Sequence, residues 1–329
     1  MPRVLVTSLN GEAGPHFDLF AENGFEVHIA DRSLDLWQED VLITAAEGYD
    51  AVIAGSEPWT EKVLRALPQL RVISRSGVGY DAVDTKICDE LGIVVATTPG
   101  VNHHAVAEHA IATLMAIARG FPWNDMWIRQ GKWERIAGPR VMGRTLGLVG
   151  LGRIGQATAT RAAGLGMKLI AYEPYADDNF IAKWGIELVG VDELFSRADY
   201  VTLHCPATEE TKHLVNADRL AMMKEDAVLI NTARGSLVDE TALIAALQNK
   251  QIRAAGLDVF EEEPLPLTSP LVGMENVLLS GHVAGLDHES HDGTFGMNAQ
   301  TIIDLHAGRW PTEQIRNLEG VKDWTWEKT

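Results

Sequence analysis

The stretch TLGLVGLGRIGQATATRAAGLGMKLIAYE, residues 145–173, decides the fold of this 329-residue chain. It begins with a short apolar run that is typical of a buried parallel strand. It then turns through Gly150, Gly152 and Gly155 and continues as a segment that fits a helix ending near Gly166. A second apolar run, KLIAYE, follows and ends in an acidic residue. The pattern therefore predicts a strand, a glycine turn, a helix and a second strand in succession.

Each glycine of this turn has a separate use in binding a dinucleotide. Gly150 permits the tight turn, Gly152 lets the backbone approach a pyrophosphate, and Gly155 lets the helix pack closely on the strand. The N–H groups of the first helical turn have no partner within the helix and can bind the anion. Glu173 lies 18 residues beyond Gly155, where a carboxylate accepts hydrogen bonds from a ribose 2′-hydroxyl and repels a 2′-phosphate. Because residues 174–177 contain no Arg or Lys, we favour NAD over NADP.

Composition limits the partners of the chain. Its 46 acidic and 28 basic residues give a formal charge of −18, which argues against a nucleic-acid or anionic-membrane surface. The two cysteines, Cys88 and Cys205, are too few for a disulfide framework, and the start MPRVLVTSLN has too short an apolar run for a signal peptide. No segment approaches a membrane span in length, and we expect a cytoplasmic protein. A chain of 329 residues is long enough for two domains.

The first 99 residues alternate between strand-like apolar runs and helix-compatible segments, which predicts a parallel sheet covered on both faces. This part has no dinucleotide fingerprint, so it is expected to have a different task. After its fourth strand-like run comes RSGVGYD, residues 75–81, in which two glycines flank a valine. Successive N–H groups in such a turn can form a nest for a carboxylate. The alternative is an ordinary turn in which Asp81 or Asp84 starts the next helix, and spacing alone does not separate the two.

A long helix is predicted to follow Asn102, a residue suited to an N-cap, and to run to Arg119, with Gly120 and Pro122 ending it. Its apolar positions cover more than one stripe, so we expect it to be buried between elements or subunits. Three tryptophans come next, which we interpret as core or interface filling rather than a ligand site. They are Trp123, Trp127 and Trp133.

A second series of strands and helices follows residue 173, and polar residues stand at the ends of its predicted strands. In open α/β sheets ligands bind at the carboxyl ends of the strands, so these side chains are expected to face one crevice. They are His204, Arg234, Asp258 and His282. Residues 287–292 are rich in Asp and His but lack the H-E-x-x-H spacing of a zinc site. We interpret them as the solvated start of a helix spanning 287–306, with no metal.

These motifs together resemble those of the D-isomer-specific 2-hydroxyacid dehydrogenases, a family that includes phosphoglycerate dehydrogenases and hydroxypyruvate/glyoxylate reductases. The matching segments occur in the family's order from residue 75 to residue 285, and several spaced motifs in one order are far more specific than any one alone. They are RSGVGYDAVD, TTPGVNHHAVAEH, VGLGRIG with Glu173, LHCPATEETKHLVN, LINTARGSLVDE, AAGLDVFEEEPLP and LLSGHVAG.

The resemblance implies two α/β parallel-sheet domains with the active site in the cleft between them. Residues 1–101 and 286–329 would form a flavodoxin-like substrate-binding domain, and residues 102–285 a Rossmann-like NAD-binding domain. It also implies a small-molecule 2-oxo or 2-hydroxy acid as substrate, NAD as cofactor, and a homodimer formed through residues 102–133.

The resemblance further implies roles for individual residues. Arg234, in NTARG, would bind the carboxylate and carbonyl of a 2-oxo acid, His282 would exchange the proton, and Glu263 would orient and charge that histidine. Asp258 would bond the nicotinamide carboxamide. The N–H groups of four residues would hold the substrate carboxylate, namely Ser76, Gly77, Val78 and Gly79. The cofactor-binding set is Gly150, Gly152, Arg153, Ile154, Gly155, Glu173, His204, Cys205, Pro206, Thr211, Thr232, Ala233, Arg234, Asp258, His282 and Gly285.

The chain departs from the family pattern in two places. Members often carry Pro before the histidine, whereas Gly281 makes this backbone freer, which bears on the placement of His282. Phosphoglycerate dehydrogenases place basic residues in the loop after the third strand, but here that loop is GSEPWT. We therefore favour a small unphosphorylated 2-oxo acid such as glyoxylate or hydroxypyruvate. The alternative is a 3-phosphoglycerate dehydrogenase, in which Arg75 or a residue of a partner subunit serves the phosphate. An NAD-sensing protein of the corepressor type is a second class on the same scaffold.

Overall fold

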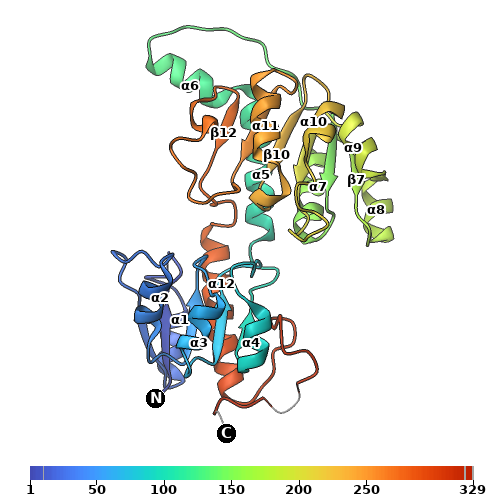
Figure 1. The fold of residues 1–329 in the computed structure, drawn as a ribbon. Helices are drawn as coiled ribbons and strands as arrows, with labels where there is room; N and C mark the ends of the chain where they lie inside the picture. Colours follow the sequence, from blue (N-terminus) through green and yellow to red (C-terminus); the bar gives the residue numbers. More distant parts are fainter. Residues whose placement is uncertain (10, 322–323, 328–329) are drawn as a thin grey trace. The chain divides into compact units, whose positions relative to one another are not determined.

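The computed structural model describes residues 1–9, 11–321 and 324–327. The chain forms two compact units (Figure 1), which are Met1–Asn102 with Asp287–Thr329 (unit 1) and His103–Leu286 (unit 2). Each unit is built on one parallel sheet with helices against it, so the predicted α/β class is confirmed. Among the described helices, none is both long and apolar enough to span a bilayer.

Unit 1 contains a five-stranded sheet with the order β2-β1-β3-β4-β5. Its strands are β1 Arg3–Val6, β2 Glu26–Ile29, β3 Ala51–Ala54, β4 Val72–Arg75 and β5 Val94–Ala96. Its helices are α1 His16–Glu22, α2 Glu39–Ala46, α3 Glu61–Ala66, α4 Thr85–Leu91 and α12 His288–His306.

Successive residues of these strands face opposite sides of the sheet. Leu5 and Ile73 belong to the core formed with α2, α3 and α4, whereas Val4 and Val72 belong to the core formed with α1 and α12. Both faces are apolar because helices cover both, as is usual for parallel sheets. Figure 1 shows α12, in orange-red, against the blue part of the chain, so the C-terminal segment completes the cover of a sheet made by the first 96 residues.

Unit 2 contains a seven-stranded sheet with the order β12-β11-β10-β9-β6-β7-β8. Its strands are β6 Thr145–Val149, β7 Lys168–Tyr172, β8 Glu187–Leu188, β9 Tyr200–Leu203, β10 Val228–Asn231, β11 Ala254–Leu257 and β12 Val277–Leu279. Its helices are α5 His103–Arg119, α6 Phe121–Arg129, α7 Arg153–Gly164, α8 Asp178–Trp184, α9 Val191–Arg197, α10 Ala217–Met222 and α11 Glu240–Gln248, with short 3-10 turns at Gly235–Leu237 and Pro270–Gly273.

The strand order of unit 2 reverses at β6. The chain leaves β6 toward β7 and β8 on one side and then returns to β9 on the other side. The carboxyl ends of β6 and β9 therefore border the crevice where ligands bind in open α/β sheets. This is the place of the glycine turn, which connects β6 to α7.

One sequence expectation for unit 2 needs correction. Pro122 does not end the helical region, because it occupies the first turn of a separate helix, α6, where its missing N–H costs no hydrogen bond. Of the tryptophans expected to fill a core or an interface, Trp123 packs against the core beneath α5 and α7, whereas Trp133 is 81% exposed in the single chain. The short elements α8 and β8, between β7 and α9, were not anticipated.

Candidate active site

The loop after β10 carries Arg234 and is held by the last residue of that strand. The side chain of Asn231, in a residue only 1% exposed, donates from Nδ2 to the Arg234 carbonyl (2.8 Å) and accepts the Ala233 N–H at Oδ1 (3.0 Å). A Cβ at Gly235 would come within 1.9 Å of the Phe260 backbone. Only glycine therefore allows this loop to lie directly on the neighbouring one, and the position of the Arg234 backbone follows from both contacts.

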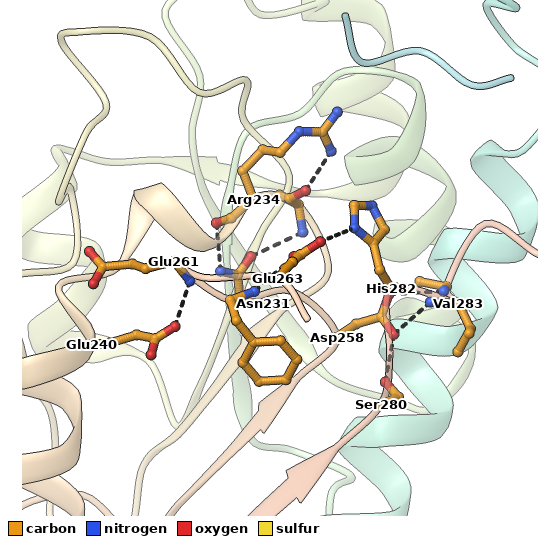
Figure 2. A network of polar contacts seen from close by, with 12 residues as sticks. Asn231, Arg234, Glu240, Asp258, Glu261, Glu263, Ser280, His282 and Val283 are labelled. Atoms are coloured by element: carbon orange, nitrogen blue, oxygen red, sulfur yellow. Dashed lines mark hydrogen bonds and ion pairs between the residues drawn. The ribbon is translucent and has the colours of Figure 1, made fainter. Parts of the chain in front are cut away.

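His282 and Glu263 form a hydrogen-bonded pair. The Nδ1 atom of His282 lies 2.7 Å from Oε2 of Glu263, while Oε1 accepts the Phe260 N–H at 2.9 Å. Burial, the largest single influence, raises the pKa of Glu263, but the hydrogen bond and charge of His282, the Phe260 amide and the charge of Arg234 together lower it below its usual value. Figure 2 shows Glu263 between Arg234 and His282.

The pairing decides which nitrogen of His282 can act on a substrate. An ionised carboxylate only accepts hydrogen bonds, so Nδ1 of His282 carries the proton that faces Glu263. Nε2 is then the nitrogen that can give or take a proton elsewhere. The arrangement is a histidine whose tautomer and ring orientation are set by a carboxylate, as acid–base catalysis requires.

The backbone at His282 is left-handed, with φ +56°, which is uncommon for a residue other than glycine. Asp258, which is 1% exposed, holds this conformation through both its backbone carbonyl and its side-chain carboxylate. Its carbonyl accepts the His282 N–H (2.7 Å), and its two carboxylate oxygens accept the N–H groups of Val283 (3.0 Å) and Ala284 (2.9 Å). The hydrogen bonds from His282, Val283 and Ala284 to Asp258 thus restrict the backbone freedom that Gly281 introduces.

The glycine turn after β6 is shaped by close backbone contacts. Gly150 has φ +97°, and a Cβ there would lie 2.7 Å from backbone atoms of both His204 and Cys205. A Cβ at Gly155 would lie 2.2 Å from the Gly150 carbonyl oxygen. A Cβ at Gly152 would meet nothing within 4 Å, and the backbone there (φ −70°) is one that any residue adopts. Steric contacts within the protein thus require glycine at two positions, while the third leaves open space.

The two residues that follow Gly152 carry donors suited to an anion. The N–H groups of Arg153 and Ile154, in the first turn of α7, have no hydrogen-bond partner in the described part of the chain. Glu173 follows β7, and its carboxylate accepts the N–H of Leu151 (2.8 Å) and of Tyr175 (2.9 Å). It is therefore fixed beside the turn, with lone pairs left to accept from hydroxyl groups.

The end of β9, which faces the glycine turn, is electrically neutral. Burial lowers the pKa of His204 to about 3, and its Nε2 lies 3.0 Å from the Thr202 hydroxyl. Burial also raises the pKa of Cys205 to about 11. An imidazole and a thiol that are both uncharged at neutral pH leave the N–H groups of the turn as the groups that attract an anion.

Comparison with known proteins agrees with this geometry. Residues 111–284 match the family model described as D-isomer specific 2-hydroxyacid dehydrogenase, NAD binding domain. The chain is 39% identical to the glyoxylate reductase of Korarchaeum cryptofilum, over 98% of this chain and 97% of that protein. It is 41% identical to the D-3-phosphoglycerate dehydrogenase of a Synechocystis species over 88% of this chain, but spans only 52% of that protein. A crystal structure from Thermus thermophilus superimposes with a TM-score of 0.87 at 35% identity, covering 95% of this chain and 99% of the other.

The chain belongs to the D-isomer specific 2-hydroxyacid dehydrogenase family. It is an NAD-dependent oxidoreductase, as the glycine turn and the acid at Glu173 predicted. The open space at Gly152 and the unpartnered N–H groups of α7 fit a dinucleotide.

In this dehydrogenase the turn after β4 offers fewer free donors than its sequence suggests. The Ser76 N–H bonds the carbonyl at the end of β3 (2.9 Å), and the Gly77 N–H bonds the carbonyl two residues before it (2.9 Å). The N–H groups of Val78 and Gly79 have no partner among the described residues. The expected nest is thus reduced from four donors to two.

The same turn is held by side chains of unit 1. Arg75 donates from Nε to the Gly79 carbonyl (3.1 Å). Asn298 of α12, fully buried, accepts from Ser74 Oγ (2.7 Å) and donates to Ser76 Oγ (3.2 Å). Asp84, rather than Asp81, caps α4 by accepting the N–H of Ile87, so this segment is both a helix start and a donor-bearing turn.

The predicted site residues of the dehydrogenase fall on three places. Arg234, Glu263, Asp258 and His282 lie at or after the ends of β10, β11 and β12, which are neighbours in one sheet. The turn residues 150–155 with Glu173, His204 and Cys205 lie at the ends of β6, β7 and β9. The turn at residues 76–79, predicted to bind the substrate, lies in unit 1. The other predicted cofactor residues lie in loops after β9, β10 and β12: Pro206, Thr211, Thr232, Ala233 and Gly285.

Three residues that position the site were not singled out from the sequence. Asn231 holds the Arg234 loop, and Ser280 and His109 contact Asp258. Asn231 had a local signal, because a polar residue ends an otherwise apolar strand three positions before the arginine. His109 had none, since its partners come from a distant part of the sequence. The group at 287–292 starts a helix, where Asp287 caps α12 by accepting the Ser290 N–H (2.6 Å).

Proposed function

We propose that this dehydrogenase reduces a small unphosphorylated 2-oxo acid, of the glyoxylate or hydroxypyruvate type, to the D-2-hydroxy acid. The observation that carries the proposal is the His282–Glu263 pair at 2.7 Å, placed after adjacent strands with Arg234 in the sheet that holds the dinucleotide turn. This combination supplies a proton and a fixed cation for a carbonyl and its carboxylate, beside a hydride source.

The proposed roles follow from the contacts of each residue. Bound NADH supplies the hydride that reduces the carbonyl carbon. Arg234 offers a planar fork of donors to the carboxylate and the carbonyl oxygen. Within unit 1, the backbone N–H groups of Val78 and Gly79 suit a carboxylate. His282 gives its Nε2 proton to the carbonyl oxygen, and Glu263 stabilises the charged ring before transfer. In the oxidation direction the same nitrogen accepts the hydroxyl proton.

The preference for an unphosphorylated acid is supported by the loop after β3. Glu57, 2% exposed, accepts the Gly55 N–H (3.0 Å) and the Trp59 indole N–H (3.3 Å), and its carboxylate also bonds the Thr7 hydroxyl. A buried acid at the carboxyl end of this sheet opposes a second anionic group. A relative that matches over 98% of this chain and 97% of its own length is named a glyoxylate reductase. The similarity to phosphoglycerate dehydrogenases keeps 3-phosphoglycerate as the alternative substrate.

The experiment is a panel of 2-oxo acids with NADH, followed by nicotinamide absorbance. Glyoxylate, hydroxypyruvate, pyruvate and 3-phosphohydroxypyruvate should be compared by kcat/KM. We expect turnover of the unphosphorylated acids to exceed that of the phosphorylated one. A preference for 3-phosphohydroxypyruvate would establish the alternative. Tight NADH binding without turnover of any acid would instead indicate a cofactor-sensing protein.

We further propose that the chain prefers NADH to NADPH because of Glu173. Its carboxylate is held by two backbone N–H groups beside the turn and cannot move away from a 2′-phosphate without losing them. Glu173→Ala should therefore improve kcat/KM for NADPH relative to NADH. Equal use of both cofactors by the wild type would contradict the proposal.

We also propose a homodimer, formed through α5, α6 and the segment up to residue 133. Phe121, Ile128 and Trp133 in this region are more than half exposed, which is unusual for a group of large apolar side chains. Light scattering should give twice the chain mass of 36.0 kDa, and Ile128→Glu should shift the protein toward monomer. A monomeric wild type would exclude the dimer.

The charge of −18 disfavours nucleic acid as a partner. The two free thiols favour a cytoplasmic location, which cell fractionation tests.

A further inference from the structure

A chain of polar contacts links helix α5 to the loop that carries His282. The Nε2 atom of His109 lies 3.0 Å from Oγ of Ser280, and Ser280 Oγ lies 2.6 Å from Oδ1 of Asp258. The same Nε2 is 3.7 Å from Asp258 Oδ1. All of these residues belong to unit 2. Figure 2 shows Ser280 and Val283 converging on the carboxylate of Asp258 below His282.

The direction of the hydrogen bonds follows from what each group can donate. Both oxygens of Asp258 already accept a backbone N–H, from Val283 and Ala284. The carboxylate therefore acts as an acceptor, and the single Ser280 hydroxyl proton is directed to Oδ1. Because that proton is used, the Ser280 oxygen can only accept from the ring, so Nε2 of His109 carries a hydrogen. The order of donation is His109 to Ser280 to Asp258.

Asp258 is where this chain of contacts acts on the catalytic loop. It is 1% exposed, and a buried carboxylate is stable only when its oxygens are hydrogen-bonded. Its two oxygens and its carbonyl hold three successive N–H groups, those of His282, Val283 and Ala284. A left-handed residue persists only when its surroundings determine it. The orientation of the Asp258 carboxylate therefore sets the direction in which the His282 ring leaves the backbone.

We propose that His109 is a positioning residue for the reaction, acting through Ser280 and Asp258 on the backbone of His282. Its ring contacts Ser280 and Asp258, and it fixes from the side of α5 the carboxylate that holds the loop. The inference goes beyond the carboxamide contact expected of Asp258. It rests on the proposed function, because it takes His282 as the proton donor.

The test is a double-mutant cycle with His109→Leu, Ser280→Ala and the combined variant. Each single change should lower kcat for the preferred 2-oxo acid about tenfold, equivalent to about 1.4 kcal/mol in the barrier, while NADH affinity, measured by fluorescence, stays within about twofold. The double variant should be no slower than either single variant, because a relay broken once has nothing more to lose. His109→Gln, whose amide can donate to Ser280, should restore most of the activity.

A matched control lies on the same helix. His104→Leu changes an exposed histidine of α5 that contacts Arg161 and the ring of His103, and it should leave kcat unchanged. Thermal unfolding of each variant shows that it is folded. Additive losses in the double variant, or a His109→Gln variant as slow as His109→Leu, would overturn the proposal. A loss of NADH affinity that matches the loss of kcat would also overturn it, because the network would then act on the cofactor.

A second measurement does not depend on turnover. In protein labelled with ¹⁵N-histidine, the nitrogen shifts of His282 report whether Nδ1 carries the proton that faces Glu263. We expect this pattern in the wild type and in His104→Leu, and its loss in His109→Leu and Ser280→Ala. An unchanged pattern in both network variants would contradict the positioning role. If the wild type turned over none of the acids while the pattern still changed in the variants, the proposed function would fail and the structural link would stand.

Discussion

Replacing Gly152 with alanine should separate cofactor binding from stability. A Cβ at this position would meet no atom within 4 Å, and the backbone, with φ −70°, is one that alanine adopts without strain. Loss of a glycine at the helix N-cap and the gain from a less flexible unfolded chain each amount to about 1 kcal/mol or less and oppose one another. The ligand-free variant should therefore unfold within a few degrees of the wild type.

The effect on the cofactor should be much larger. The methyl group would occupy open space at the residue directly before Arg153 and Ile154, whose N–H groups have no partner in the described part of the chain. If it prevents one hydrogen bond to a charged group, the loss is about 1.5–3 kcal/mol. This corresponds to an increase in the Kd of NADH of roughly 10- to 150-fold, at about 1.4 kcal/mol for each factor of ten.

Gly150→Ala is the matched comparison. Its Cβ would lie 2.7 Å from backbone atoms at the end of β9, and its φ of +97° disfavours any side chain. Overpacking of this kind costs about 1–3 kcal/mol, and for a unit of this size each kcal/mol lowers the Tm by roughly 2–4 °C. We therefore expect this variant, unlike Gly152→Ala, to lose on the order of 2–12 °C in the absence of any ligand.

The assays are thermal unfolding of the ligand-free proteins and NADH titration by fluorescence. Unfolding of Gly152→Ala at as low a temperature as Gly150→Ala would refute the first expectation, because the methyl would then have met protein atoms. NADH binding by Gly152→Ala as tight as that of the wild type would refute the second, because the pyrophosphate would not then approach this glycine.

Three further predictions concern the catalytic loops. His282→Ala should lower kcat by about 10²- to 10⁴-fold while NADH still binds, and near wild-type turnover would end its assignment as proton donor. Arg234→Ala should lower kcat/KM for the 2-oxo acid by roughly 10- to 150-fold, the loss expected for one hydrogen bond to a charged group, and an unchanged value would count against its role. The pKa of Glu263 is lowered from 4.5, so the stability it contributes is complete above pH 4.5 and is lost as the pH falls through its folded-state pKa. Between pH 6 and pH 4 the Tm of Glu263→Gln should fall less than that of the wild type, and equal falls would contradict this.

The sequence predicted the fold well wherever the physical cause is local. The succession of strand, glycine turn, helix and strand at 145–173 follows from short-range sterics and from the period of apolar residues, and it appears as β6, α7 and β7. Helix α6 was not predicted from these local patterns. A proline usually ends a helix, and only the structure shows that Gly120 starts a new helix with Pro122 in its first turn. It also did not anticipate α8 and β8, which are too short for a clear periodic pattern.

The candidate site also has features that could be predicted from the sequence and features that depend on contacts between distant segments. The predicted strand ends were enough to indicate Arg234 and His282 as polar residues of one site, whereas Glu263 and the three catalytic roles were predicted only from the resemblance to the family. Which backbone donors are free could not be predicted, since the Ser76 N–H is used by the end of β3, a partner set by strand pairing. The contact between His109 and Asp258 likewise joins residues that are far apart in sequence.

The sequence by itself determined the two parallel-sheet units, the dinucleotide turn and the set of groups that can carry hydride-transfer chemistry, because these depend on local backbone preferences and on side-chain type. The tertiary structure decided how those groups are held. It placed α12 on a sheet formed by the start of the chain, left the N–H groups of Val78 and Gly79 without a partner among the described residues, and used Asp258 to hold His282 in a left-handed conformation. These features depend on hydrogen bonds and packing between segments distant in sequence, which only the folded chain brings together.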